Sequence, residues 1–226
     1  MTAGKAAAKD DTCLYNCSYL PVNSIQSFSD ILYILCCGTG VGFSCERSEV
    51  EQLPTIPVEI VRNEENFIVV VDSREGWADA YNSLLSSLYN GIHPTWELHK
   101  IRPKGARLKT FGGRASGPDP LEKLFKYTVN MFYKQSGSRL TSINVHDLVC
   151  MIGEVVISGG VRRSALISLS DLDDREMAKA KSGPWWDDSS HRSLSNNSAV
   201  YESKPTLGRF MEEWALLYDS RSGERG

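Results

Sequence analysis

The chain has 226 residues, a formal net charge of −3, 41% hydrophobic residues and 23% charged residues, which is typical of a globular protein. This charge provides no basic field for the backbone of a nucleic acid, so a nucleic-acid partner is not expected. No apolar run reaches the roughly 18 residues of a membrane helix, and Met1 to Asp11 lack the apolar core of a signal peptide. We therefore expect a cytoplasmic protein without a membrane partner.

Residues 1–12 are predicted to form a mobile leader, and the apolar residues at 14–20 predict a strand that ends near Pro21. Cys17 lies in this strand. A free cysteine is most often a buried small hydrophobe, but on a rigid strand it can also be a redox thiol facing a pocket. The residues alone favour the buried alternative. None of the six cysteines lies in a CxxC pair or at zinc-finger spacing from a histidine, so neither a metal site nor a disulfide framework is predicted.

Apolar residues at spacings of three and four predict a helix around 28–35, followed by the glycines of Gly38-Thr39-Gly40-Val41-Gly42. These glycines end a helix and open a strand. A dinucleotide-binding fingerprint has the reverse order, because its glycines follow a strand and open a helix. We therefore reject dinucleotide binding and expect a sharp turn with close backbone approach.

Residues 46–66 are polar and are predicted to be a connection, whereas the β-branched run at 67–71 predicts a fully buried strand. Asp72 is predicted to cap the following helix, with Glu75 three residues later. Asn90-Gly91 is predicted to end this helix.

Four cations lie between Arg102 and Lys109 beside glycine and proline. Such a loop is either solvated surface or a clamp for a polyphosphate. Helices are predicted around 121–132 and 145–156, and the second ends at Gly159-Gly160. Arg162 and Arg163 follow on a loop, which is either a helix end with surface arginines or a switchable binding loop.

Strands are predicted at 166–169 and 196–201, separated by a polar stretch at 170–195, and a last helix is predicted over 207–218. Alternation of apolar strands with helices predicts an α/β fold in a single domain. The last helix is followed by a turn at 220–226, with no strand to return to, so the domain is expected to be incomplete.

Six stretches taken together resemble the catalytic subunit of ribonucleotide reductase. They are "YNCSYLP" at 15–21, "CGTGVGFS" at 37–44, "VDSREGW" at 71–77, "IRPKGARLKTFGGRASGP" at 101–118, "SGGVRRSA" at 158–165 and "SNNSAV" at 195–200. Their order is that of the family, and the long segment between the second and fourth is similar to the monomeric, adenosylcobalamin-dependent class II. The resemblance implies the first half of an α/β barrel over 13–226, with an effector-region insertion at 46–113.

The resemblance implies reduction of a ribonucleoside triphosphate to its deoxyribonucleotide by thiyl-radical chemistry. Cys17 matches the barrel cysteine that forms a redox pair with a second thiol, which a thioredoxin-like reductant restores. The motif that carries the radical cysteine is not in this sequence, so the remaining C-terminal part of the enzyme is an implied partner. Adenosylcobalamin is implied as the cofactor, bound mainly by that remaining part, and the chain alone is expected to be inactive.

The resemblance also implies allosteric control by a deoxynucleoside triphosphate. The matching specificity-loop residues are Ser158, Gly159, Gly160, Val161, Arg162 and Arg163, and the matching effector contacts are Asn23, Ser24, Arg102 and Lys109. Two alternatives remain open on the sequence: a module that binds deoxynucleotides without catalysis, and a non-functional remnant with an exposed sheet edge.

Overall fold

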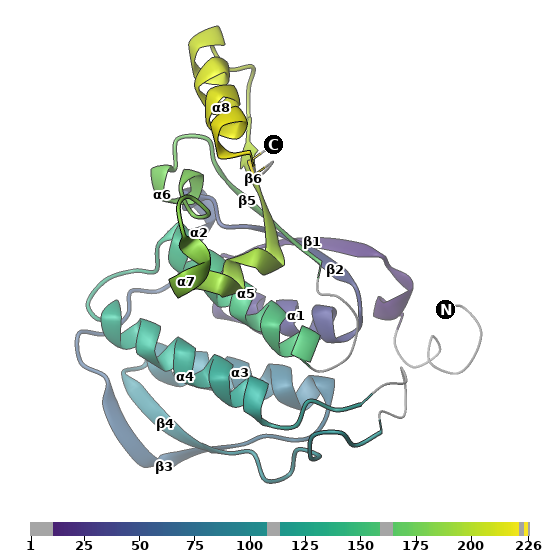
Figure 1. Ribbon diagram of the computed structural model, residues 1–226. Coiled ribbons are helices and arrows are strands. Elements are labelled where there is room, and N and C mark those ends of the chain that lie inside the picture. The colour runs from purple at the N-terminus through teal and green to yellow at the C-terminus, as the bar shows by residue number, and fades with distance from the viewer. Residues whose placement is uncertain (1–10, 108–113, 159–164, 222–223, 226) are drawn as a thin grey trace.

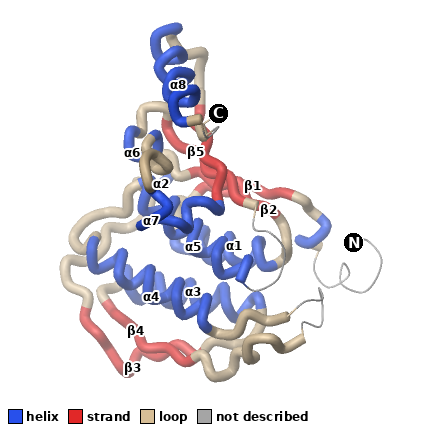
Figure 2. The backbone as a smooth tube through the Cα atoms, in the orientation of Figure 1, coloured by secondary structure: helices blue, strands red, loops and turns tan. Residues whose placement is uncertain are grey.

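The computed structural model describes residues 11–107, 114–158, 165–221 and 224–225, and these residues form four layers. Figure 1 shows a two-stranded sheet at the bottom, then α3 and α4, then α1 and α5, and finally a four-stranded sheet. The tube in Figure 2 shows both pairs of helices between the two sheets. This mixed α/β arrangement with parallel sheets agrees with the predicted fold class.

The four-stranded sheet has the order β1-β2-β5-β6, and all its pairs are parallel. Its strands are β1 (Cys17–Pro21), β2 (Gly40–Ser44), β5 (Leu166–Asp171) and β6 (Ser195–Val200). Alternate residues such as Val41, Phe43 and Leu166 are buried against the helices. Their neighbours on the other face, including Tyr19 and Ile167, are exposed. Parallel sheets are normally covered on both faces. The described residues cover only the helix side of this sheet and leave its other face uncovered.

Helix α1 (Ile25–Cys36) connects β1 to β2 and ends in the predicted glycine turn. Gly38 adopts φ +86°, a backbone conformation that favours glycine. Gly40 then opens β2, where an added Cβ would lie 3.2 Å from the Cβ of Ala165 on the neighbouring chain segment. The prediction of a sharp turn with close backbone approach is therefore confirmed.

The second sheet consists of β3 (Val61–Val69) and β4 (Ile92–Glu97), which are parallel and joined by α3 (Arg74–Tyr89). The prediction of a fully buried strand at 67–71 was wrong, because β3 begins at Val61 within the supposed connection and alternates in burial. Ile68 and Val70 are buried, whereas Phe67 is exposed. The apolar run was misleading because only one face of this small sheet meets a helix.

The predicted cap of α3 was also wrong by one residue. Ser73 is the N-cap and accepts a hydrogen bond from the backbone N–H of Gly76. Asp72 instead accepts a hydrogen bond from Arg102. The predicted end of the helix is confirmed, since Asn90 is the C-cap and Gly91 adopts φ +75°.

Helices α4 (Asp119–Lys134) and α5 (Ser142–Ser158) complete the central layers. Their fully buried residues include Leu124, Phe125, Val145 and Leu148, which join α1 and α3 in one core. Figure 1 shows these four helices between the two sheets. It holds α5 in place, and α5 leads to the segment that contains the predicted specificity loop.

Short helices occupy the stretches that the sequence left irregular. They are η1 (Thr12–Leu14), α2 (Arg47–Val50), α6 (Arg175–Ala178), α7 (Trp185–Ser189) and η2 (Ser190–Leu194). The last helix, α8 (Leu207–Ser220), projects from the body in Figure 1. Its exposed apolar residues are Leu207, Phe210, Met211, Trp214, Leu216 and Tyr218, whereas Glu213 is buried. Across the part of the chain that the structure describes, no helix is both long and apolar enough to cross a membrane.

Candidate functional site

The uncovered face of the four-stranded sheet carries Cys17. This residue opens β1 and pairs in register with Gly40 of β2. Its thiol is exposed, so the preference for a buried structural cysteine that the residues alone suggested was wrong. The Asn16 side-chain amide lies 3.4 Å from the sulfur. An exposed thiol on a rigid strand is accessible for thiol–disulfide exchange.

Four other cysteines whose side chains the structure describes are buried in the core. Cys36, Cys37, Cys45 and Cys150 all belong to this group, as the sequence predicted. Burial raises the pKa of the Cys36 thiol to about 12 and raises the pKa of Cys45 and of Cys150 as well. These three buried thiols therefore stay protonated and unreactive, which sets Cys17 apart from them.

The predicted effector contacts lie at two separate places. Ser24 caps α1 by accepting from the backbone N–H of Ser27, and Asn23 donates to Glu49 at 3.0 Å. Arg102 pairs with Asp72 at 2.6 Å, close to the start of α3. These contacts hold the turn before α1 and the segment after β4 in defined positions beside the central helices.

The packing of α1 against α3 separates these two places. Arg74, in the first turn of α3, donates to the sulfur of Cys37 at 2.9 Å, just beyond the end of α1. Asn82, further along α3, donates to Gln26 near the start of α1. The two helices are therefore antiparallel. Because α1 has 12 residues, Ser24 lies about 18 Å from the end that faces Arg102.

The remaining predicted site residues lie at the edge of or outside the described chain. Ser158 is the last residue of α5. Lys109 lies outside the described residues, as do Gly159, Gly160, Val161, Arg162 and Arg163. Arg107 and Arg114, which border residues 108–113 on either side, form an antiparallel β-bridge.

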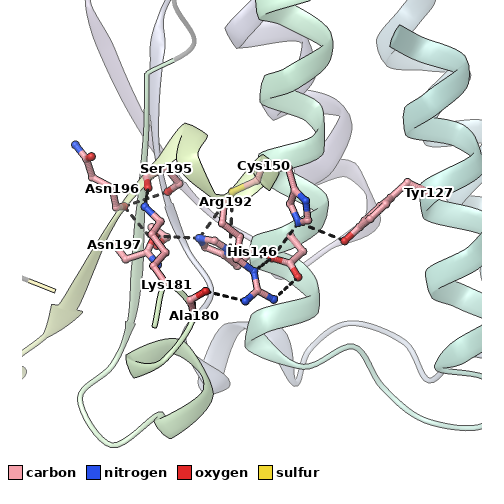
Figure 3. A network of polar contacts seen from close by, with 12 residues as sticks. Tyr127, His146, Cys150, Ala180, Lys181, Arg192, Ser195, Asn196 and Asn197 are labelled. Atoms are coloured by element: carbon pink, nitrogen blue, oxygen red, sulfur yellow. Dashed lines mark hydrogen bonds and ion pairs between the residues drawn. The ribbon is translucent and has the colours of Figure 1, made fainter. Parts of the chain in front are cut away.

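A buried polar network that the sequence reasoning missed joins α5 to η2 and is drawn in Figure 3. At its centre is Asp147, which accepts two hydrogen bonds from Arg192, each 2.7 Å long. The ring nitrogens of His146 and His191 lie 3.2 and 3.3 Å from the same carboxylate. Burial by itself raises the pKa of Asp147, but the hydrogen bonds from His146, His191 and Arg192 outweigh it. They hold the pKa of Asp147 well below its ordinary value.

The same network orients β6. His146 uses its Nε2 atom to contact the Asn197 side-chain oxygen at 3.0 Å, and the Ser168 hydroxyl donates to that oxygen at 3.1 Å. Asn197 is thereby buried toward the helices. Its neighbour Asn196, which pairs in register with Ile167, is exposed. In an alternating strand, Asn196 therefore lies on the uncovered face with Cys17.

Two residues near the C-terminal end of the chain return to the outer edge of β6. The Asn197 backbone N–H donates to the Glu224 carboxylate at 2.9 Å, and its carbonyl accepts from the Arg225 N–H at 2.7 Å. Lys181 binds both Glu224 and the Ser195 carbonyl. The sequence predicted a turn at 220–226 with no strand after it, and residues 224–225 are a turn, which packs against the outer edge of β6.

No cluster of three or more metal-ligating side chains is present among the described residues, so they show no metal site. A cavity of about 190 Å³ lies between α4 and α5. It is lined by Asp119, Pro120, Lys123, Met151, Glu154 and Val155. Its volume is suited to a few small groups rather than to a large cofactor.

Comparison with known proteins identifies similar sequences. A family model described as "B12-dependent ribonucleotide reductase, insertion domain" matches residues 55–132, which include β3, α3, β4 and most of α4. The adenosylcobalamin-dependent ribonucleoside-triphosphate reductase of Lactobacillus acidophilus is 31% identical over 78% of this chain and 29% of its own length. The enzyme of the same name from Levilactobacillus brevis is 30% identical over 92% of this chain and 33% of its own length.

A solved structure shares the fold. The crystal structure of a B12-dependent, class II ribonucleotide reductase superposes with a TM-score of 0.73 at 25% sequence identity. The match covers 83% of this chain and 33% of that one. The chain thus spans about a third of the length of the relatives it matches.

Proposed function

Because the chain is a homologue of part of the class II ribonucleotide reductases, we propose that it supplies the first half of a reductase barrel. In this proposal Cys17 is one of the two thiols that reduce a ribonucleoside triphosphate to its deoxyribonucleotide. The observation that carries it is the position of Cys17, exposed on the uncovered face of a parallel sheet. We place the reaction in the cytoplasm, where a reducing environment keeps the thiol available.

The chemistry requires two electrons at the 2′-carbon of the ribose. Two thiols become a disulfide, the 2′-hydroxyl leaves as water, and a hydrogen replaces it on the sugar. Cys17 supplies one sulfur, and the second belongs to the remaining part of the enzyme. A thioredoxin-like dithiol then restores the pair by thiol–disulfide exchange. A strand position suits this role because the sulfur must meet both substrate and partner thiol within tight distance limits.

Adenosylcobalamin is the cofactor named for the relatives, and when bound it supplies the initiating radical. The cavity between α4 and α5, at about 190 Å³, is too small for a corrinoid with its adenosyl ligand. This cavity therefore does not fit the cofactor, and we assign the binding of adenosylcobalamin mainly to the remaining part of the enzyme.

We further propose that the segment following α5 and the loop around Arg102 take part in allosteric control by a deoxynucleoside triphosphate. Arg102 and Lys109 would bind the phosphates, while residues 158–163 would respond to the occupied site. The ion pair between Arg102 and Asp72 supports a structured loop base beside α3. Asn23 and Ser24 would contact the other end of the nucleotide, which has to lie along α1.

The test is a chimeric enzyme in which residues 13–226 replace the matching region of the Lactobacillus acidophilus reductase. Multiple turnover is measured with a dithiol reductant, beside the variants Cys17→Ser and Cys45→Ala. We expect Cys17→Ser to stop multiple turnover, because the dithiol can no longer be regenerated. Cys45→Ala should keep turning over, because that buried thiol lies in the core.

Normal multiple turnover by the Cys17→Ser chimera would contradict the role of Cys17. A folded but inactive chimera with Cys17 intact would instead favour a module that only binds deoxynucleotides. Titration calorimetry of the chain with each of the four deoxynucleoside triphosphates then separates binding from loss of function, since a remnant gives no binding heat.

A further inference from the structure

Helix α8 carries an apolar stripe that is exposed along its whole length. Its members follow the helical spacing of three and four residues, and each is between 47% and 76% exposed: Leu207, Phe210, Met211, Trp214 and Tyr218. These five residues are called the α8 stripe below. An amphipathic helix of a globular protein normally turns such a stripe toward the core. Figure 1 instead shows α8 projecting from the body.

A different side of α8 is held against the body. Arg209 donates to the Leu172 carbonyl just beyond the end of β5, and it pairs with Glu213 at 3.3 Å. Glu213 is 7% exposed and lies 3.5 Å from the Arg225 guanidinium, which also donates to the Asp174 carbonyl. The helix therefore buries its ion pairs and exposes its apolar stripe, which is the reverse of the usual arrangement in a helix that has no further partner.

Two aromatic rings of the stripe are already paired with each other. The rings of Trp214 and Tyr218 stack one turn apart, with centroids separated by 5.6 Å and planes inclined by 12°. A preformed aromatic pair loses little conformational freedom when a partner covers it, and buried aromatic side chains often dominate the energy of protein interfaces. The stripe therefore has the residue types and the order that a docking surface requires.

The size of α8 argues against a second copy of this chain as the partner. A helix of 14 residues is about 21 Å long and about 10 Å wide, so it offers a footprint of about 210 Å² to an identical helix. Even twice this area falls short of the roughly 800 Å² that each partner contributes to a stable interface. The stripe must therefore be part of a larger contact.

We propose that the α8 stripe is a docking surface for the remaining part of the reductase, which covers it with an apolar surface. The matches take up 29% of one relative and 33% of another, so about two thirds of each enzyme lies outside them. The proposed function already places this part against the four-stranded sheet, because its thiol has to reach Cys17. Since Arg209 holds the base of α8 beside the end of β5, one partner can reach both surfaces. The inference rests on the proposed function for the identity of the partner.

The experiment measures the oxidation of two tryptophans by hydroxyl radicals, in the full chain and in a chimeric enzyme, by mass spectrometry of peptides. In the chimera, residues 13–226 replace the matching region of the Levilactobacillus brevis reductase, whose similarity covers 92% of this chain. Trp214 and the control Trp186 on α7 are similarly exposed, at 51% and 58%. We expect similar rates for both in the full chain. In the chimera Trp214 should be oxidised several-fold more slowly, whereas Trp186 should keep its rate.

Two variants test whether the covered stripe contributes to stability. Trp214→Ser should leave the urea midpoint of the full chain almost unchanged, because the residue is exposed there, but it should lower the midpoint of the chimera. Trp186→Ser is the matched control and should change neither midpoint. If the large replacement prevents folding, a second chimera carries only Leu207–Ser220 in the Levilactobacillus brevis enzyme, and Trp214 is measured there in the same way.

Equal rates of Trp214 oxidation in the full chain and in the chimera would overturn the proposal. Slow oxidation of Trp214 in the full chain would overturn it as well. Protection at every concentration would mean that the stripe folds back on its own chain, and protection only at high concentration, with a dimer in sedimentation, would mean a second copy. A chimera that protects Trp214 without turning over would support docking while contradicting the role of Cys17, so the two proposals fail separately.

Discussion

Replacing Asp147 with asparagine should lower the free energy of unfolding much more than the matched change Asp188→Asn. The Asp147 residue is 7% exposed and accepts two 2.7 Å hydrogen bonds from the Arg192 guanidinium. Asn keeps the shape but removes the charge and places an amide group against donors. Breaking a buried ion pair from one side typically costs about 3–5 kcal/mol. Since whole domains are stable by only about 5–15 kcal/mol, this loss is large.

The assay is urea unfolding followed by circular dichroism, with Asp188→Asn as the matched control. Asp188 is exposed on α7, so its replacement should change the free energy of unfolding by no more than about 0.5 kcal/mol. A loss below about 1 kcal/mol for Asp147→Asn would refute the reasoning, because it would mean that Arg192 keeps its solvation or finds another partner.

The pH dependence provides an independent check on the same residue. The pKa of Asp147 is lower in the folded chain than in the unfolded chain, where it is about 4. The folded state therefore holds the proton less tightly. The stability from Asp147 is fully present above about pH 4–5 and is lost as the pH falls toward the folded pKa. Asp147→Asn should accordingly flatten the fall in the urea midpoint between about pH 5 and pH 3.

Three further outcomes follow from burial and capping. Iodoacetamide should modify Cys17 much faster than Cys45 at pH 8, because burial raises the pKa of the Cys45 thiol; comparable rates measured by peptide mapping would be contrary evidence. Leu84→Ala should cost about 2–5 kcal/mol in urea unfolding, whereas Leu216→Ala on the exposed side of α8 should change stability by about 0.5 kcal/mol or less. Ser24→Ala should cost about 1 kcal/mol through loss of the α1 cap, and restoration by Ser24→Asp would separate capping from packing.

Much of the element order was predictable because local signals agree with the tertiary structure. The apolar spacing of α1 and the glycines that follow it have a local cause, and the end of α3 at Asn90-Gly91 does too. Register across the main sheet was not predictable in this way. It depends on contacts such as Gly42 with Ile167, more than 120 residues apart in the chain.

Errors arose where a tertiary partner competes with a local signal. Asp72 has the right residue type for a helix cap, but Arg102 takes its carboxylate and Ser73 caps α3 instead. The apolar run near Phe67 resembles a buried strand, but the small sheet has only one covered face. His146 and Asp147 gave no sequence signal at all, because their partners come from η2 and β6.

The sequence by itself determined the alternation of strands and helices and the family resemblance, because both depend on residue order along the chain. It placed Cys17 on the first strand, but it did not show whether that thiol is buried. Only the tertiary structure decided this, since exposure depends on which faces of a sheet are covered by elements from elsewhere in the chain. The same reason applies to α8, because the ion pairs of Glu213 with Arg209 and Arg225 decide which side of the helix faces outward.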